Sequence, residues 1–493
     1  MPENAKRQKL SPVDEGREKA VDRISDLPDS LLLHILSFVE AHEIVKTSLL
    51  SKRWKSLWAS VTTLNFSTGK WVNSLCFVTY VNSFLMLREG QKVCKFRARF
   101  DSRGVQHVCI DSWFNYLKRR GVEELDFDFS RFFGCLEPRI IIEPEKYVIC
   151  NSLFDCKVLR VMRLRGCDVD PTARFCFNLL KELRLDNVNI STLDLSCCPL
   201  LECLTLRHCN KGFTLDIHAP STKLRNLTII DSFVARNEKL VLCAPHVSSI
   251  AFCESCRVHY DMKDLSSLTK VYLKLRLLQD EDGLIGLIEA IGGTPTFVLS
   301  SSCLEALAYA ILNTGDIPSF NIVTLEIQTD LSRLDIWLIT HVLRIFPYVE
   351  SLIFNVCTKW EHMAGLSGLV LQFSRRSKLA WESLGRHFVS AADGITKVEI
   401  INFLKNKLSQ KHKYSYGDSL NNMIGFLNLA DNEEMKSVKL LLQSCSMLKE
   451  MDIKITNMKH VGDSFVKSDF LLYLNNTVQR LPRISKNVEI SVS

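Results

Sequence analysis

The sequence predicts an α/β protein in which a short helical N-terminal unit is followed by a curved solenoid with a capping C-terminal region. Two patterns support this fold class. Apolar residues recur at helical spacing between residues 22 and 66, and a strand-like apolar pattern then returns at steps of 21 to 23 residues. Hydrophobic residues make up 46% of the 493, which is enough for a large core and for more than one domain.

Three short helices are predicted in the N-terminal unit. Leu27 and Pro28 precede Asp29 and Ser30, where proline suits a helix start and short polar side chains can cap free N–H groups. The first helix then has an apolar stripe, and Ser51 is placed to cap the third. The apolar residues of the three helices are Leu31, Leu32, Ile35, Leu36 and Val39, then Ile44, Val45 and Leu49, then Trp54, Leu57 and Trp58. So small a unit forms a marginal core and needs a partner or a following domain.

The solenoid is predicted from repeated segments of the form L-x-x-L-x-L. Leu159, Leu180 and Leu201 begin three such segments, 21 residues apart. Other copies begin at Val122, Leu224, Val247, Leu268, Ile322 and Val349. This is the leucine-rich-repeat signature, with one strand per repeat and alternate residues pointing inward. Unrelated amphipathic strands are disfavoured, because three matching segments follow a constant step. The interval from 273 to 322 is irregular, with an expected helix at about 282–291.

A small residue follows the last apolar position of several repeats by three residues. These residues are Cys167, Cys209, Ser232, Ser255 and Cys357. We expect them to be buried where the chain turns out of the strand, because there a small side chain can meet backbone groups.

The N-terminal helices resemble the F-box of a large plant family. The matching pattern is Leu-Pro-x-x-Leu, then Ile-Leu-Ser, then Val-x-Thr-Ser-x-Leu-Ser-Lys-Arg-Trp-x-x-Leu-Trp, from Leu27 to Trp58. The F-box is the docking module of ubiquitin-ligase adaptors. The resemblance implies that a Skp-type adaptor contacts Leu27, Pro28, Ile35, Leu36, Leu50, Arg53 and Trp54. Leucine and tryptophan anchors with an arginine are typical of interface hot spots, but some of these residues instead hold the helices together.

The C-terminal part resembles the FBD region that follows the F-box and the repeats in the same family. A predicted strand at 394–403 is followed by a helix at 433–442 and a strand ending at 455, and a polar stretch at 405–417 departs from the pattern. The Leu448-x-x-Met451-x-Ile453 spacing also continues the repeat, so this region can equally be the distal end of one solenoid. We expect a disordered tail at 1–20, the F-box at 21–66, the leucine-rich-repeat solenoid at 67–390, and the FBD-like region and cap at 391–493.

Enzymatic and metal-binding functions are not predicted. The sequence has no phosphate-binding glycine loop and no H-E-x-x-H or G-x-S-x-G motif. The pair Cys253-x-x-Cys256 lacks a second pair at zinc-site spacing, so we interpret it as structural thiols. No metal or other cofactor is therefore expected.

The 18 cysteines are expected to be buried thiols, because the polar N-terminus does not read as an export signal. No apolar run approaches the roughly 18 residues of a membrane helix. The expected location is intracellular, in the nucleus and/or the cytoplasm.

A basic column is predicted on the concave face of the solenoid. If Met162 and Leu164 point inward, Arg163 and Arg165 point to the concave side. The same register places Arg184, Arg207 and Lys274 there, with Asp186 as a counter-charge. Such a column is usually a solvated strand face, but the concave side of a solenoid is also where partners bind. Arginine clusters favour carboxylate or phosphate groups, so this face is a candidate for recognising an acidic or phosphorylated segment of a target.

These observations and the resemblance predict a substrate-recognition adaptor of a Skp–cullin–F-box ubiquitin ligase. The F-box would dock on the Skp-type adaptor, which is tied to a cullin scaffold, and the repeats would bind an unidentified target protein. One alternative is a leucine-rich-repeat co-receptor for a small molecule, and another is a protein-binding scaffold independent of a ligase. Nucleic-acid binding is disfavoured, because the net charge of +7 is dispersed and is not interleaved with aromatic residues.

Overall fold

The computed structural model describes most of the chain. The described residues are 24, 26–67, 74–88, 92–102, 105–130, 146–149, 153, 156–170, 174–190, 192–209, 214–220, 222–232, 238–254, 258–275, 281–314, 318–357, 381–404, 428–429, 431–455 and 464–493. Within these ranges, no helix is long and apolar enough to cross a membrane.

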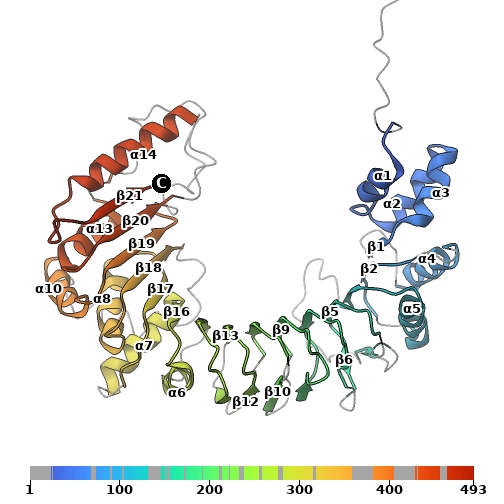
Figure 1. The fold of residues 1–493 in the computed structure, drawn as a ribbon, viewed down its shortest axis with the longest axis horizontal. Helices are drawn as coiled ribbons and strands as arrows, with labels where there is room; N and C mark the ends of the chain where they lie inside the picture. Colours follow the sequence, from blue (N-terminus) through green and yellow to red (C-terminus); the bar gives the residue numbers. More distant parts are fainter. Residues whose placement is uncertain are drawn as a thin grey trace, which may run out of the picture.

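The described part of the chain forms a horseshoe whose inner side is one parallel sheet (Figure 1). This sheet has 15 strands. In spatial order they are β1 (Thr63–Ser67), β2 (Lys95–Arg99), β3 (Glu124–Asp128), β5 (Val161–Arg165), β7 (Glu182–Asp186), β9 (Cys203–Arg207), β11 (Asn226–Ile230), β13 (Ser249–Glu254), β15 (Lys270–Leu275), β16 (Thr296–Leu299), β17 (Thr324–Thr329), β18 (Ser351–Val356), β19 (Lys397–Ile401), β20 (Glu450–Lys454) and β21 (Glu489–Val492). The predicted α/β class, with short N-terminal helices before a solenoid, is confirmed.

The outer side of the horseshoe changes along its length. Helices cover the two arms: α4 (Ser74–Met86) and α5 (His107–Arg119) on the first, and α6 (Glu281–Ile291), α7 (Ser301–Thr314), α8 (Arg333–Val342), α10 (Trp381–Ala391), α13 (Glu433–Ser444) and α14 (Ser464–Gln479) on the second. Short strands cover the middle: β4 (Val148–Ile149) pairs with β6 (Asp168–Val169), and a second sheet contains β8 (Thr192–Asp194), β10 (Thr214–His218), β12 (Glu238–Cys243) and β14 (Val258–Lys263). Helices need about 8–10 Å of lateral room and strands about 4.8 Å, so the arms curve more than the middle (Figure 1).

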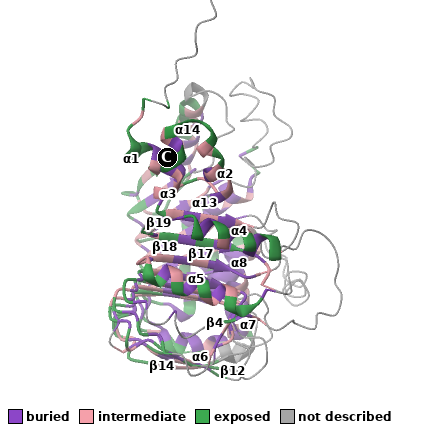
Figure 2. Cartoon of the chain, turned by 90° about the vertical axis from the view of Figure 1, so that its right-hand side faces the viewer, coloured by how far each residue is buried: buried purple, intermediate pink, exposed green. Residues whose placement is uncertain are grey.

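The repeat pattern places its three apolar positions in the core. Leu159, Met162 and Leu164 are all buried, and the register pairs Met162 with Leu183 and Leu164 with Leu185. Figure 2 shows the buried residues running along the sheet, with exposed residues on α1 and α14. The predicted helix at 282–291 is confirmed by α6, whereas β16 and α7 were not predicted, because Thr294 replaces the first apolar residue of that copy.

The sheet extends beyond the repeats that the sequence analysis identified. β1 and β2 follow the same spacing, as Val61-x-x-Leu64-x-Phe66 and Val93-x-x-Phe96-x-Ala98, with phenylalanine and alanine in place of leucine. All of β1 except Ser67 therefore lies inside the range expected for the F-box. At the other end, β19, β20 and β21 continue the same sheet through the range expected for the FBD-like region. The predicted polar stretch at 405–417 lies outside the described residues.

The turns out of four successive strands, β5, β7, β9 and β11, each contain a residue with a positive φ. Asn187, His208 and Asp231 have φ values of 56°, 51° and 43°, and Gly166 has 69°. Asparagine, aspartate, histidine and glycine are the residues that best tolerate this left-handed region.

The predicted small residue comes next in the chain. The Cys209 thiol donates to the Leu185 carbonyl at 3.2 Å, and the Cys209 N–H donates to the Ser232 hydroxyl at 3.3 Å. The Cys357 thiol lies 3.8 Å from the Thr329 carbonyl, and Cys167 is buried as expected. Ser255 lies outside the described residues.

The N-terminal unit contains α1 (Asp29–Leu36), α2 (Ala41–Lys46), a short 3-10 helix (Thr47–Leu49) and α3 (Lys52–Ser60). The predicted Ser51 cap is confirmed, since the Trp54 N–H donates to its hydroxyl at 3.4 Å. α1 begins at Asp29, but no side chain caps it, and the Asp29 carboxylate accepts from Arg53 instead. The core of the unit consists of Leu32, Leu36, Ile44, Trp54, Leu57 and Val61.

The N-terminal unit packs directly on the solenoid. Trp58 contacts the cores of both parts, and its ring meets Phe84 of α4 edge-on with the centroids 5.4 Å apart. Ala41 of α2 is buried in the solenoid core. Because β1 also joins the sheet, the helical unit is held at one end of the horseshoe by both packing and backbone pairing.

Candidate protein-docking surfaces

The first candidate surface is an exposed apolar side of α1. Leu31 and Ile35 lie four residues apart on the helix, and Phe38 follows three residues later in the turn after it. This spacing places all three on one side, which we call the α1 face. All three are exposed, whereas Leu32 and Leu36 turn into the core. Adjacent exposed large apolar side chains are typical of a docking surface.

Two further leucines are exposed where the 3-10 helix ends. Leu49 and Leu50 are the last residue of that helix and its C-cap, and both side chains are mostly in solvent. Pro28 is also exposed, immediately before α1. The N-terminal unit therefore leaves much of its apolar content outside its own core, as its small size predicts.

Arg53 ties the third helix to the start of the first. Its Nε donates to Asp29 Oδ1 at 2.8 Å, and its Nη2 donates to the Leu27 carbonyl at 2.5 Å. An ion pair this exposed contributes at most about 1 kcal/mol. Its effect is therefore chiefly positional, because it fixes Leu27 and Pro28 against α3.

The structure separates the residues that the sequence analysis assigned to adaptor contact. Pro28, Ile35 and Leu50 are exposed, and Leu27 and Arg53 are partly exposed. Leu36 and Trp54 are only 2% and 7% exposed, so we correct their role to core packing. They are buried because they supply the apolar surface on which the three helices meet.

Sequence reasoning missed Leu31, Phe38 and Leu49 as exposed residues. The helical period did contain a signal for two of them, since it places Leu31 and Phe38 on the same side as Ile35. Nothing in the period says which side faces the core.

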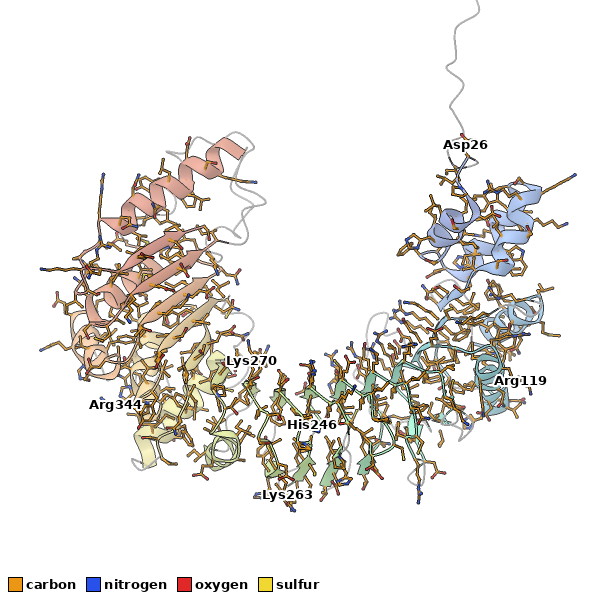
Figure 3. All side chains as sticks on the ribbon, viewed as in Figure 1. Asp26, Arg119, His246, Lys263, Lys270 and Arg344 are labelled. Atoms are coloured by element: carbon orange, nitrogen blue, oxygen red, sulfur yellow. The ribbon has the colours of Figure 1, made fainter. Side chains whose placement is uncertain are left out.

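The second candidate surface is the concave face of the sheet, whose first strands neutralise their own charges. Side chains fill this face along its whole length (Figure 3). Between β2 and β3, the pairs are Lys95–Glu124 at 2.8 Å, Arg97–Asp126 at 2.7 Å and Arg99–Asp128 at 3.1 Å. Such alternating pairs favour strand association, since opposite charges face each other across the ladder.

The predicted basic column is therefore only partly free. Arg163 makes two bonds to Glu182, at 2.9 and 3.0 Å, and Arg165 pairs with Asp186 at 2.9 Å and with Asp128 at 3.4 Å. Both arginines thus lie on the concave face in ion pairs within the sheet, and both side chains remain partly exposed. Arg184, Arg207 and Lys274 form no ion pair with any described carboxylate.

The middle of the concave face is uncharged. From β9 to β13 the concave residues other than Arg207 are Cys203, Thr205, Asn226, Thr228, Ile230, Ser249, Ala251 and Cys253. Charge returns on β15, where Lys270 lies 3.5 Å from Glu326. Further along, Lys397 pairs with Glu450 at 2.8 Å and Lys454 with Glu399 at 2.6 Å. We call the neutral stretch with Arg184, Arg207 and Lys274 at its borders the central gap.

Burial affects the ionisation of two thiols in the solenoid core. Burial raises the pKa of Cys209 to about 12 and that of Cys198 to about 11, so both remain protonated. Among the described residues, no three His, Cys, Asp or Glu side chains are grouped to hold a metal ion. Cys256, the second residue of the pair noted in the sequence, lies outside the described residues.

Comparison with known proteins agrees with this geometry. The F-box domain model matches residues 24–65, which cover the three helices and most of β1. The model described as "FBD-associated F-box protein At5g56370, LRR repeats" matches residues 110–354, from α5 to β18. The chain therefore carries an F-box followed by leucine-rich repeats. The resemblance found in the sequence is thereby confirmed.

This F-box protein is similar to several proteins of Arabidopsis thaliana. F-box/LRR-repeat protein At3g03360 is 28% identical over 361 residues, covering 68% of this chain and 70% of the relative. F-box/LRR-repeat protein At4g14103 is 29% identical over 364 residues, covering 68% and 91%. FBD-associated F-box protein At5g22730 is 26% identical over 264 residues, covering 51% and 55%. The F-box and leucine-rich-repeat families imply a protein of the substrate-adaptor type, and such adaptors are typically not enzymes.

Proposed function

We propose that this F-box protein is the substrate-recognition subunit of a Skp–cullin–F-box ubiquitin ligase. The observation that carries the proposal is the α1 face: a folded F-box unit presents Leu31, Ile35 and Phe38 to solvent rather than to its own core. Leaving large apolar side chains in water is unfavourable by about 25 cal/mol per Å² of surface, and a protein partner would remove that surface from water.

The α1 face, Pro28 and Leu50 are the contacts that we assign to the Skp-type adaptor. Apolar anchors of this kind dominate interface energies when they enter a pocket of the partner. Arg53 and Leu27 support the interface by fixing the segment that precedes α1.

The concave face is the surface that we assign to the target protein. It is the open inner side of the horseshoe, and solenoids use such extended concave surfaces to bind partners. The chain itself would perform no chemistry. It would hold the target near a ubiquitin-charged enzyme, so that target lysines meet that enzyme at a high effective concentration.

The junction between the F-box and the solenoid suits this role. Trp58 against Phe84 and the pairing of β1 with β2 fix the F-box relative to the concave face. A rigid connection keeps the distance from adaptor to target within narrow limits. A freely jointed connection would dilute the effective concentration.

The test is co-purification of the full chain with a Skp-type adaptor. The diagnostic variant is Leu31→Lys/Ile35→Lys, which alters only the exposed α1 face. The matched control, Ser30→Lys/Ser56→Lys, adds the same charge at exposed polar positions of α1 and α3. We expect both variants to keep the wild-type thermal midpoint, and only the first to lose the adaptor. The proposal is wrong if the wild-type chain captures no adaptor, or if the α1-face variant captures as much as the control.

A further inference from the structure

We propose that the central gap is a docking site for an extended, carboxylate-rich segment of a protein substrate. Arg184 and Arg207 would bind its carboxylates at one border, and Lys274 would bind a carboxylate at the other. Calling the bound protein a substrate rests on the proposed function above, but the binding itself does not.

The first argument is the point at which the charge ladder ends. Along one row of the concave face, the register aligns Arg99, Asp128, Arg165, Asp186 and Arg207 in alternating sign. Asp186 is already occupied, because it pairs with Arg165 at 2.9 Å and lies 3.4 Å from His208 Nδ1. On its other side, Arg207 is in register with Ile230, which carries no charge. The ladder thus ends on a cation.

The state of the Arg207 side chain supports this. Its Nε is buried and has no hydrogen-bond partner among the described residues. A buried donor without an acceptor costs free energy, and the cost is larger for a charged group. Because the protein itself covers Nε, a carboxylate of a bound segment would pair with the Nη end of the guanidinium, which forms no ion pair with a described carboxylate.

The second argument concerns the neighbouring row of concave residues, in which positive and negative side chains also stop alternating. Arg163 and Arg184 are in register on adjacent strands, so two cationic residues are direct neighbours across the sheet. Like charges directly opposite each other are unfavourable in a sheet. Glu182 neutralises Arg163 with two bonds, while Arg184 forms no ion pair with a described carboxylate. The next residue in this row is Thr205, which cannot neutralise it.

The third argument is the size of the gap. Lys274 is in register with Cys253, Ile230 and Arg207, so three strand steps separate Arg207 from Lys274. At roughly 4.8 Å per step the span is about 14 Å, and four to five extended residues at about 3.3 Å each would cross it. The floor has small or polar side chains such as Thr205, Thr228 and Ala251, which leave room for a peptide. The threonines can also hydrogen-bond its backbone.

The surroundings favour a short acidic peptide over a nucleic acid. Among the described residues, the gap and its borders hold three cations without an ion pair and one aromatic side chain, Tyr272, whose hydroxyl donates to Gln328 at 3.4 Å. Glu182 and Asp186 border the gap on one side and Glu326 on the other. These carboxylates would repel a continuous phosphate backbone, whereas they would confine a short acidic segment to the space between them.

The experiment measures binding of a fluorescein-labelled, 12-residue peptide of alternating glutamate and glycine to the full chain by fluorescence anisotropy. The diagnostic variant is Arg184→Glu/Arg207→Glu. The matched control is Lys239→Glu/Lys263→Glu, which changes the net charge by the same amount on the outer strands β12 and β14. Figure 3 shows Lys263 on the outer side and Lys270 toward the concave side.

We expect the diagnostic variant to bind the peptide at least about tenfold more weakly, because it loses two charge-assisted contacts, and the control to change by less than about twofold. A second probe, a single-stranded oligonucleotide of equal charge, should bind more weakly than the peptide. The proposal is overturned if the wild-type chain does not bind the peptide, if both variants weaken binding equally, or if the oligonucleotide binds more tightly. Capture of the Skp-type adaptor by the same variant is a separate measurement. Loss of peptide binding with adaptor capture retained concerns the central gap alone, whereas a wild-type chain that binds the peptide but captures no adaptor contradicts only the proposed ligase role.

Discussion

At the scale of single residues, the turns after β5, β7, β9 and β11 use residues that tolerate a positive φ. Gly166 has the largest such value among the repeat turns, at 69°. A Cβ at this position would lie 3.1 Å from the backbone nitrogen of Ser130 in the neighbouring repeat. Both the backbone conformation and the close approach therefore call for glycine.

We predict that Gly166→Ala destabilises the protein by about 1–2 kcal/mol, since an L-residue is strained in the left-handed region and must also displace a backbone neighbour. The matched control is Gly385→Ala in α10, where a Cβ meets nothing within 4 Å and helix propensity should rise. Denaturant midpoints at unchanged slope would measure both. Equal effects of the two substitutions would contradict the prediction.

Asp335 gives the protein a pH dependence of stability. Its buried carboxylate accepts from the Thr329 hydroxyl at 2.5 Å and from the Asp330 N–H at 3.0 Å. Burial, aided by the charge of Asp330, raises the pKa of Asp335 to about 8. The ordinary pKa of an aspartate is about 3.9. At a pH between these two pKa values, Asp335 is protonated in the folded state and ionised in the unfolded state. Its contribution to stability is complete below about pH 4 and is lost as the pH rises through 8.

We predict that Asp335→Asn flattens this dependence, because the amide keeps an acceptor oxygen without titrating. Thermal midpoints of the wild-type and variant chains, measured from pH 5 to pH 9, test this. The wild-type midpoint should fall more steeply with rising pH. Parallel curves would show that Asp335 does not titrate in this range.

At the scale of elements, α14 shows how a helix closes the distal arm. Phe470, Leu474 and Val478 recur at helical spacing and are fully buried, so one side of α14 packs on the core. Leu472 projects from another side and is 60% exposed. Leu472 and Leu474 are thus two residues apart in the same helix, but the first is exposed and the second is buried.

We predict that Leu474→Ala costs about 2–5 kcal/mol, through lost burial and the cavity left behind. Leu472→Ala should change stability by less than about 0.5 kcal/mol. Thermal midpoints would measure both changes, and limited proteolysis would locate the loosened region in α14. A cost shared equally by the two leucines would mean that α14 does not pack as described.

At the scale of the whole molecule, the long sheet must protect two edges. The F-box helices pack beside β1, and α2 contacts the same core as that strand. The other edge is β21, which has only four residues and begins with Glu489. Short and charged edge strands resist pairing with other chains.

We predict that removing residues 464–493 makes the chain self-associate. The truncation deletes α14 and β21, which leaves β20 as an unpaired edge and exposes the core side chains that α14 covers. Light scattering coupled to size-exclusion chromatography would measure this. The full-length Leu472→Ala variant serves as the control, and its molar mass in solution should equal that of the wild-type protein. A truncated chain of unchanged mass and thermal midpoint would refute the prediction.

The sequence by itself determined the repeated strands, the three N-terminal helices and the F-box resemblance. These depend on residues close together in the chain, where strand and helix geometry set the spacing of apolar side chains. It did not reveal β1, β2 or β16, where phenylalanine, alanine or threonine replaces leucine. In those repeats the burial of each strand is decided by its neighbours rather than by its own composition.

Only the tertiary structure decided which side of each element is free. Leu36 and Ile35 are adjacent in sequence, yet one packs in the F-box core and the other faces solvent. Arg163 and Arg184 occupy equivalent positions of successive repeats, but Glu182 neutralises only Arg163. Burial and charge pairing depend on side chains from other elements or from neighbouring strands, so the spacing of residues along one segment cannot specify them.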